Sequence, residues 1–171
     1  NEFTNFNSDD SCYFLEHEKL DYISYPYEWG FYQLKKAALH HLEFQIFLLE
    51  KGAVLIDSSA YNIQFKNNKP IFIDVLSIDE YVDGDYWKGH GQFLQQFLNP
   101  LLLRSLKGVS FNEWYKGNLD GIKTSELNNI LSLKDKLSLN VFFSVVLLSK
   151  LEKQNTINPK NVHIGIGVTP R

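Results

Sequence analysis

The sequence contains no methionine, not even at its first position, and only one cysteine, Cys12, among 171 residues. A single cysteine excludes an internal disulfide and any zinc site built from two or four cysteines, and it is typical of a reducing, intracellular environment. Cys12 follows a polar run without basic neighbours that would activate its thiol, so we interpret it as unreactive. The absent start methionine predicts that the natural protein begins upstream of Asn1.

Long apolar runs and an excess of positive charge are also absent. No stretch reaches the roughly 18–20 apolar residues of a membrane-spanning helix, and no signal sequence is visible at the start. The net charge of −3 provides no general attraction to nucleic acid or anionic lipid. Hydrophobic residues make up 44% and charged residues 22%, as in globular proteins. We therefore expect one cytoplasmic globular domain that binds neither membranes nor nucleic acid.

Helical periodicity is clearest between residues 31 and 51. The apolar positions of this stretch fall on one helical face: Leu34, Ala38, Leu42, Ile46 and Leu49. Gly52 then suits a left-handed C-terminal cap. Further helices are expected over about 92–106, 124–136 and 138–153, and Pro100 should kink or split the first of these.

Strand patterns are fewer. Residues 63–65 and 71–75 flank the pair Asn67-Asn68, which tolerates positive φ and predicts a hairpin. Residues 13–19 form a third candidate strand, while 79–91 and 108–121 are typical of loops. The expected fold is therefore mainly α with a small β-hairpin (α+β). We expect a polar flexible end over 1–12, a helical domain over 13–154 and an irregular tail over 155–171.

Three polar residues have a spacing that predicts a chemical site. Asp57 and Asn62 lie five positions apart after the long helix, and Asp74 ends the hairpin twelve positions later. Protein-kinase-like phosphotransferases use this order. In them the first Asp orients or deprotonates the attacking hydroxyl, while the Asn and the second Asp hold Mg²⁺ next to the nucleotide phosphates. The pattern predicts Asp57 as the catalytic residue and Asn62 and Asp74 as metal ligands, with Mg²⁺ and ATP as cofactors.

Longer motifs resemble one bacterial family. They include Ser24-Tyr25-Pro26-Tyr27-Glu28-Trp29, Tyr61-Asn62-Ile63-Gln64-Phe65, Pro70-Ile71-Phe72-Ile73-Asp74 and Gly117-Asn118-Leu119-Asp120-Gly121-Ile122. These are similar to the kinase-like N-terminal region of proteins labelled class I SAM-dependent methyltransferases. The resemblance covers about residues 13–122 and implies the C-terminal lobe of a kinase-like fold, with residues 14–18 as the last strand of the small lobe.

The resemblance also implies partners outside this chain. These are a small-lobe segment upstream and a methyltransferase domain downstream, where SAM would bind. An unidentified small molecule or polymer would be the substrate. The pair Gly165 and Gly167 lacks the surrounding pattern of a nucleotide-binding turn, so no SAM site is expected here.

The sequence departs from active kinases in several places. Val54-Leu55-Ile56-Asp57 lacks the usual His and Arg, Asp74 is not followed by Phe-Gly, and Ser59 stands where many kinases have Lys. We therefore expect a degenerate kinase-like domain that binds nucleotide and Mg²⁺ or presents substrate. The alternatives are an active small-molecule phosphotransferase fragment and a non-catalytic interaction domain.

Overall fold

The computed structural model describes residues 17–151, which lie inside the predicted helical domain. They form a mixed α+β fold that is mostly helical and has two small antiparallel sheets. The α- and π-helical elements are α1 (Phe31–Leu49), α2 (His90–Phe93), η4 (Leu94–Leu98, π), α3 (Asn99–Lys107), α4 (Asn112–Gly117), α5 (Thr124–Ile130), α6 (Leu133–Lys136), α7 (Leu139–Val141) and η5 (Phe142–Leu147, π). The short 3₁₀ turns are η1 (Pro26–Glu28), η2 (Ala60–Asn62) and η3 (Val75–Ser77). The strands are β1 (Ala53–Leu55), β2 (Ile63–Lys66), β3 (Lys69–Phe72) and β4 (Ile78–Glu80).

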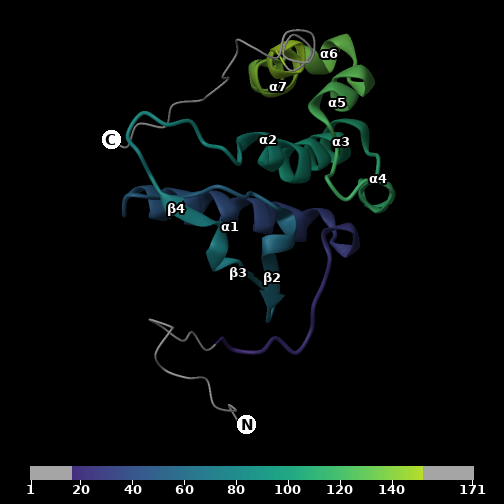
Figure 1. Cartoon of the computed structure of the whole chain (residues 1–171). Coiled ribbons are helices and arrows are strands. Elements are labelled where there is room, and N and C mark those ends of the chain that lie inside the picture. The colour runs from purple at the N-terminus through teal and green to yellow at the C-terminus, as the bar shows by residue number, and fades with distance from the viewer. Residues whose placement is uncertain (1–16, 152–171) are drawn as a thin grey trace, which may run out of the picture.

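Helix α1 is the central element, with strands β2 and β3 below it and the later helices above it (Figure 1). It ends as predicted, because Gly52 has φ of +74° and so accepts the left-handed conformation that ends helices. Its buried face differs from the predicted stripe. The buried side chains are Leu34, Ala37, Ala38, His41, Gln45 and Leu48, whereas Ile46 is exposed. Two polar residues thus take core positions that the apolar pattern had assigned elsewhere.

The predicted hairpin is confirmed. Strands β2 and β3 pair antiparallel, and Asn67 and Asn68 both have positive φ, as the turn type with two left-handed residues requires. The second sheet was not predicted. In it β1 pairs with β4 (Ile78–Glu80), so residues 79 and 80, which begin the stretch expected as a loop, belong to a strand instead. Three-residue strands carry too little alternation to be recognised from sequence.

The helix around Pro100 is interrupted, as predicted, and the interruption is a π-helical segment. The amide of Asn99 bonds to the Leu94 carbonyl, five residues back, instead of to Gln95 as in an α-helix. Pro100 has no amide hydrogen for the Gln96 carbonyl. Both freed carbonyls find other donors: the Ile122 amide bonds to Gln95 at 2.9 Å, and the buried Tyr115 hydroxyl bonds to Gln96 at 2.5 Å.

These two bonds hold α4, through Tyr115, and the segment after it, through Ile122, against the helix. Gly121 has φ of +85° and lies so close that a Cβ atom there would be 2.3 Å from the Gln95 carbonyl oxygen. The side-chain amide of buried Asn99 donates to the Ile122 carbonyl at 2.8 Å and to Thr124 Oγ1 at 3.2 Å. Residues 118–122 therefore form a fixed turn whose position depends on the π-helical carbonyls.

Several predicted boundaries were wrong. The stretch 108–121, expected as a loop, contains α4, and the single helix expected over 124–136 is divided into α5 and α6. Ser132 precedes the second of these helices and forms a capping box with Asp135. The Asp135 amide donates to the Ser132 hydroxyl, and the Asp135 carboxylate accepts the amide and the hydroxyl of Ser132. Residues 17–19 have no regular structure, and the rest of the predicted strand over 13–19 lies outside the described residues.

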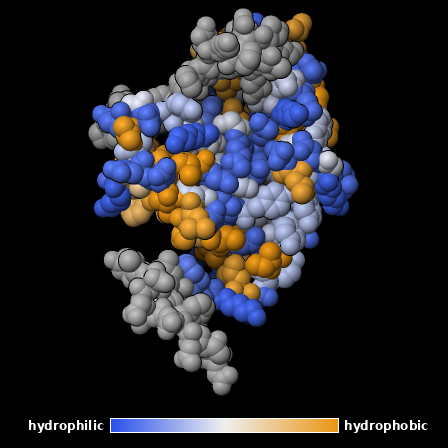
Figure 2. Space-filling model, viewed as in Figure 1, coloured by the Kyte–Doolittle hydropathy of each residue, from blue (hydrophilic) through white to orange (hydrophobic). Residues whose placement is uncertain are grey.

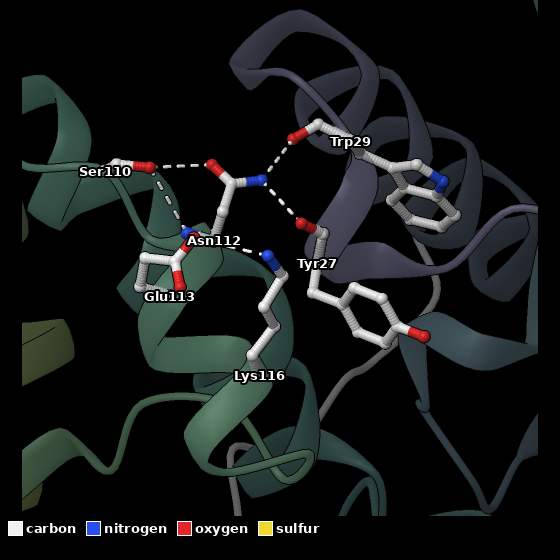
Figure 3. Close-up of polar contacts among 6 residues, drawn as sticks. All are labelled: Tyr27, Trp29, Ser110, Asn112, Glu113 and Lys116. Carbon is white, nitrogen blue, oxygen red and sulfur yellow. Dashed lines mark hydrogen bonds and ion pairs between the residues drawn. The ribbon is translucent and has the colours of Figure 1, made fainter.

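Asn112 at the start of α4 holds the aromatic connector that precedes α1. Its side-chain amide donates to the carbonyl of Tyr27 at 2.8 Å and to that of Trp29 at 3.0 Å. Its own oxygen accepts from Ser110 at 2.7 Å (Figure 3). This side chain joins segments more than eighty residues apart in the sequence. No helix among residues 17–151 is long and apolar enough to cross a membrane.

The packing of Gly121 gives a test of this fold. We expect Gly121→Ala to lower the free energy of unfolding by about 2–4 kcal/mol, because the new methyl group meets a backbone carbonyl in a left-handed conformation. Chemical denaturation monitored by circular dichroism measures this. Gly117→Ala is the matched control. A Cβ there meets nothing within 4 Å, so stability should stay unchanged or rise by up to about 1 kcal/mol.

Candidate functional site

The loop that carries Asp57 begins at the end of strand β1, whose last residue is buried. Leu55 is fully buried, and its amide donates to the side chain of Gln45 in α1 at 2.9 Å. Its carbonyl accepts the indole N–H of Trp87 at 3.0 Å. These bonds fix the last residue of β1 on both sides. The position of Asp57, two residues later, is therefore well defined where the chain passes from the core to the surface.

Two glutamines one helical turn apart hold the rest of the loop. Gln92 Oε1 accepts the Ser58 amide at 2.8 Å, and Gln96 Oε1 accepts the Ala60 amide at 2.8 Å and the Ser59 hydroxyl at 3.2 Å. Gln96 is buried, so these bonds form in a setting where an unpaired amide would be costly. We call these two side chains the glutamine clamp.

Asp57 itself is partly exposed and shapes the loop. One carboxylate oxygen accepts the Ser59 amide at 2.7 Å, which is the local turn that Asp side chains commonly form. The Ser59 hydroxyl in turn accepts the Tyr61 amide at 3.2 Å. Asp57 thus has a structural role in the loop as well as a position that faces solvent.

Asn62 and Asp74 lie beside each other across the hairpin. The Asn62 carbonyl accepts the Ile73 amide at 2.9 Å, and Ser77 bridges the two side chains. Asn62 Nδ2 donates to Ser77 Oγ at 3.2 Å, and the Ser77 hydroxyl donates to the Asp74 carboxylate. The other Asp74 oxygen accepts the Leu76 amide at 3.1 Å. Because Asn62 donates through its nitrogen, its amide oxygen is the atom that it can offer to a cation.

An open pocket of about 350 Å³ brings two of the three predicted residues together. Its lining residues are Asp57, Ser59, Tyr61, Asn62, Gln92, Gln96, Leu119 and Asp120. Asp74 is outside this lining and is connected to it through Ser77 and Asn62. The lining contains no lysine or arginine. Among residues 17–151 no three His, Cys, Asp or Glu side chains form a metal cluster, so a cation here would need amide or ligand oxygens as well.

The sequence alone did not identify the clamp, Ser77 or Asp120 as part of this site. Gln92 and Gln96 have helical i, i+4 spacing, which indicates that they share one face, but not which loop that face meets. Asp120 stands in a motif that the sequence analysis had matched without giving it a role. Only the contact between the turn at 118–122 and the π-helical segment brings it to the pocket.

His41, in helix α1, is surrounded by aromatic side chains. It is fully buried, and the rings of Phe72, Trp87, Phe93 and Phe97 have centroids 5.5–6.1 Å from its own. Neither ring nitrogen has a hydrogen-bond partner. Burial lowers its pKa to about 4, and the charge of the neighbouring His40 acts in the same direction. His41 is therefore a neutral packing residue that contacts the elements on which the loop and the clamp depend.

A second cavity, of about 670 Å³, lies between α1, the helix that contains Pro100 and the helical residues 140–151. Its lining is almost wholly apolar: Leu42, Trp87, His90, Phe93, Leu94, Leu98, Leu102, Asn140, Val141, Phe143, Ser144, Leu147, Leu148 and Leu151. Burial lowers the pKa of His90 within it. The lining contains no carboxylate, and His90 is its one titratable side chain.

Comparison with known proteins gives one match among curated sequences. The chain is similar to nodulation protein NoeA of Rhizobium meliloti (strain 1021), with 46% identity over 146 residues. The match covers 85% of the chain but only 31% of NoeA, so the chain spans about a third of that relative's length. No protein-family model matches the chain, and no solved structure matches it.

The buried His41 makes stability depend on pH. Between pH about 6.5 and 4 the unfolded chain binds a proton at this side chain and the folded chain does not, so the free energy of unfolding falls as the pH is lowered. Over that range we expect His41 to account for a loss of about 3 kcal/mol. Denaturation curves at several pH values measure it. His41→Phe should remove this part of the pH dependence, and an unchanged dependence in that variant would contradict the assignment.

Proposed function

We propose that this chain is a kinase-like region of a longer protein and that its open pocket binds Mg²⁺ together with ATP. The observation that carries the proposal is the arrangement of the three predicted residues. Asp57 and Asn62 line one pocket, and Ser77 connects Asn62 to Asp74. This is the neighbourhood that a catalytic-loop Asp and two metal-holding side chains require.

The charge of the pocket supports a role for a metal. Its lining contains two carboxylates, Asp57 and Asp120, and no basic side chain. A polyphosphate would be repelled there unless a cation stood between the phosphates and the carboxylates. Mg²⁺ prefers oxygen ligands and commonly binds through one or two carboxylates plus substrate phosphates. In the proposed site, Asn62 and Asp74 would be those protein ligands.

In an active version, a substrate hydroxyl would attack the γ-phosphorus of ATP. The new bond joins the hydroxyl oxygen to phosphorus, the bond from phosphorus to the β,γ-bridging oxygen breaks, ADP leaves, and Asp57 takes the hydroxyl proton. The absent His-Arg pair before Asp57 and the Ser at position 59 favour a degenerate version that binds without transfer. Such a module would serve a methyltransferase domain elsewhere in the longer protein, where SAM would bind.

The test is calorimetric titration of the longer natural protein with ATP, with and without Mg²⁺. We expect binding only with Mg²⁺, because the pocket lining has no lysine or arginine side chain to neutralise the phosphates. Asn62→Ala and Asp74→Asn should each weaken it at least tenfold by removing a metal ligand. Asp57→Asn should change the affinity less than about threefold and, if transfer occurs, lower its rate by about 10²–10⁴-fold.

Asp79→Asn is the matched control, since Asp79 is an exposed carboxylate whose side chain bonds to the neighbouring Glu80 amide. It should bind Mg²⁺–ATP like the unmodified protein. Absence of any Mg²⁺-dependent ATP binding would overturn the proposal. Equal binding by the Asn62 and Asp74 variants would show that nucleotide binds elsewhere.

A second candidate function, an interaction domain, is favoured by apolar side chains beside Asp74. Ile73, Val75 and Leu76 are all exposed, and Leu76 is 86% accessible. The space-filling view shows hydrophobic residues gathered around the strands (Figure 2). Clustered exposed apolar residues commonly mark a contact surface. Another part of the longer protein, such as the proposed small-lobe segment, would cover them and would complete the site next to Asp74.

Charge placed at Leu76 tests this contact. In the longer protein we expect Leu76→Asp to lower the melting temperature by several degrees, because it would put a carboxylate into a covered apolar surface. Leu133→Asp is the control, since Leu133 is equally exposed, at 84%, in α6. It should have little effect, as exposed substitutions usually do. The same small effect from both variants would count against a covered surface at Leu76.

A further inference from the structure

Three tyrosine rings lie together at one rim of the pocket that contains Asp57. Tyr61 lines the pocket, and its ring centroid is 6.5 Å from that of Tyr25. Tyr25 in turn stacks on Tyr27, with centroids 5.4 Å apart and planes 10° from parallel. Tyr25 is 43% exposed. We call these three side chains the tyrosine rim. Tyr61 belongs to the pocket lining, and Tyr25 and Tyr27 extend its aromatic surface beyond that lining.

The backbone holds Tyr25 in this exposed position. The Tyr25 amide donates to the Glu28 carboxylate at 2.8 Å. The preceding residue, Ser24, is fixed through both backbone groups by the buried side chain of Gln64, at 3.0 Å each. Asn112 anchors the carbonyl of Tyr27. An exposed aromatic ring on a fixed backbone loses little conformational freedom when a ligand stacks on it.

The turn at 118–122 also contributes to the pocket lining. It presents Leu119, which is 56% exposed, and Asp120, whose amide bonds back to the Asn118 side chain at 3.2 Å. The bond from Ile122 to the Gln95 carbonyl fixes this turn against the π-helical segment. Asp120 lies near Tyr61, since its charge adds to burial and to Tyr27 in raising the pKa of that phenol. The Tyr61 hydroxyl is buried and has no hydrogen-bond partner.

The charged groups of the pocket lining are two carboxylates, which accept hydrogen bonds, and the ring of Tyr61 lies in the same lining. Carboxylates at Asp57 and Asp120 accept hydroxyl donors, and the Tyr61 hydroxyl can both donate and accept. With no lysine or arginine in the lining, the pocket does not favour an anionic ligand unless a metal is present. A ring that has hydroxyl donors at its edge and an apolar C–H face matches this combination.

We propose that this pocket binds a neutral sugar, with its C–H face against the tyrosine rim and its hydroxyl groups donating to Asp57 and Asp120. The inference rests on the proposed function in one respect: if the chain is a kinase-like region, the sugar would be the substrate whose hydroxyl group lies next to Asp57. The stacking surface and the paired carboxylates are observations that do not depend on nucleotide binding. A polyamine would also pair with the two carboxylates, so it serves as the comparison ligand in the test.

Calorimetric titration of the longer protein tests this, with neutral disaccharides built from glucose, galactose and N-acetylglucosamine as probes and spermidine as a comparison. We expect at least one disaccharide to bind without ATP. Asp120→Asn, which keeps the size of the side chain, should weaken that binding at least tenfold, and Tyr25→Ala at least fivefold. Tyr32→Ala is the control, because Tyr32 is 76% exposed on α1 and its ring contacts Phe31 instead of the tyrosine rim. It should bind normally.

Failure of every disaccharide to bind would overturn the inference, as would equal affinity in the Asp120 and Tyr25 variants. Binding of spermidine in place of sugar, with loss in Asp120→Asn, would also overturn it and would identify an amine site. Disaccharide binding without any Mg²⁺–ATP binding would reject the proposed nucleotide function and support the sugar site. Mg²⁺–ATP binding without sugar binding would do the reverse, so the two failures can be distinguished.

Discussion

The missing amide hydrogen of Pro100 is the constraint on which the site depends. An α-helix through this position would leave the Gln96 carbonyl without its donor, and the chain adopts a π-helical segment just before it. The carbonyls of Gln95 and Gln96 then accept Ile122 and Tyr115. Single-turn π segments are rare and are often found at functional sites. Here one segment both docks a distant turn and carries a member of the clamp that holds the Asp57 loop.

The same helix therefore organises the pocket from two directions. Its side chains Gln92 and Gln96 bind the backbone of the loop after β1, and its backbone binds the turn that carries Asp120. Behind it, the rings around His41 connect α1 to the hairpin and to Trp87. The pocket is a product of helix packing more than of the two small sheets. Helix packing therefore brings together polar residues that are far apart in the sequence, with little strand structure between them.

The proposed functions place different demands on this arrangement. Nucleotide binding needs a cation at Asn62 and Asp74, whereas sugar binding needs the tyrosine rim and Asp120. Phosphoryl transfer and sugar binding would both need Asp57 in a fixed position, and the glutamine clamp holds the loop that carries it. The exposed apolar residues after Asp74 are outside the pocket and would serve contact with other parts of a longer protein. The similarity to about a third of NoeA fits a region of that kind without defining its activity.

Local backbone preferences and periodicity were enough to predict the long helix, its glycine cap, the hairpin with Asn67 and Asn68, and a helix disturbed near Pro100. The spacing of Asp57, Asn62 and Asp74 also predicted a site at these residues. Only the tertiary structure decided which face of α1 is buried, that Ser77 joins Asn62 to Asp74, and that Gln96 and Asp120 reach the pocket. Those contacts connect residues fifteen or more positions apart, and local sequence patterns do not specify which distant groups will meet.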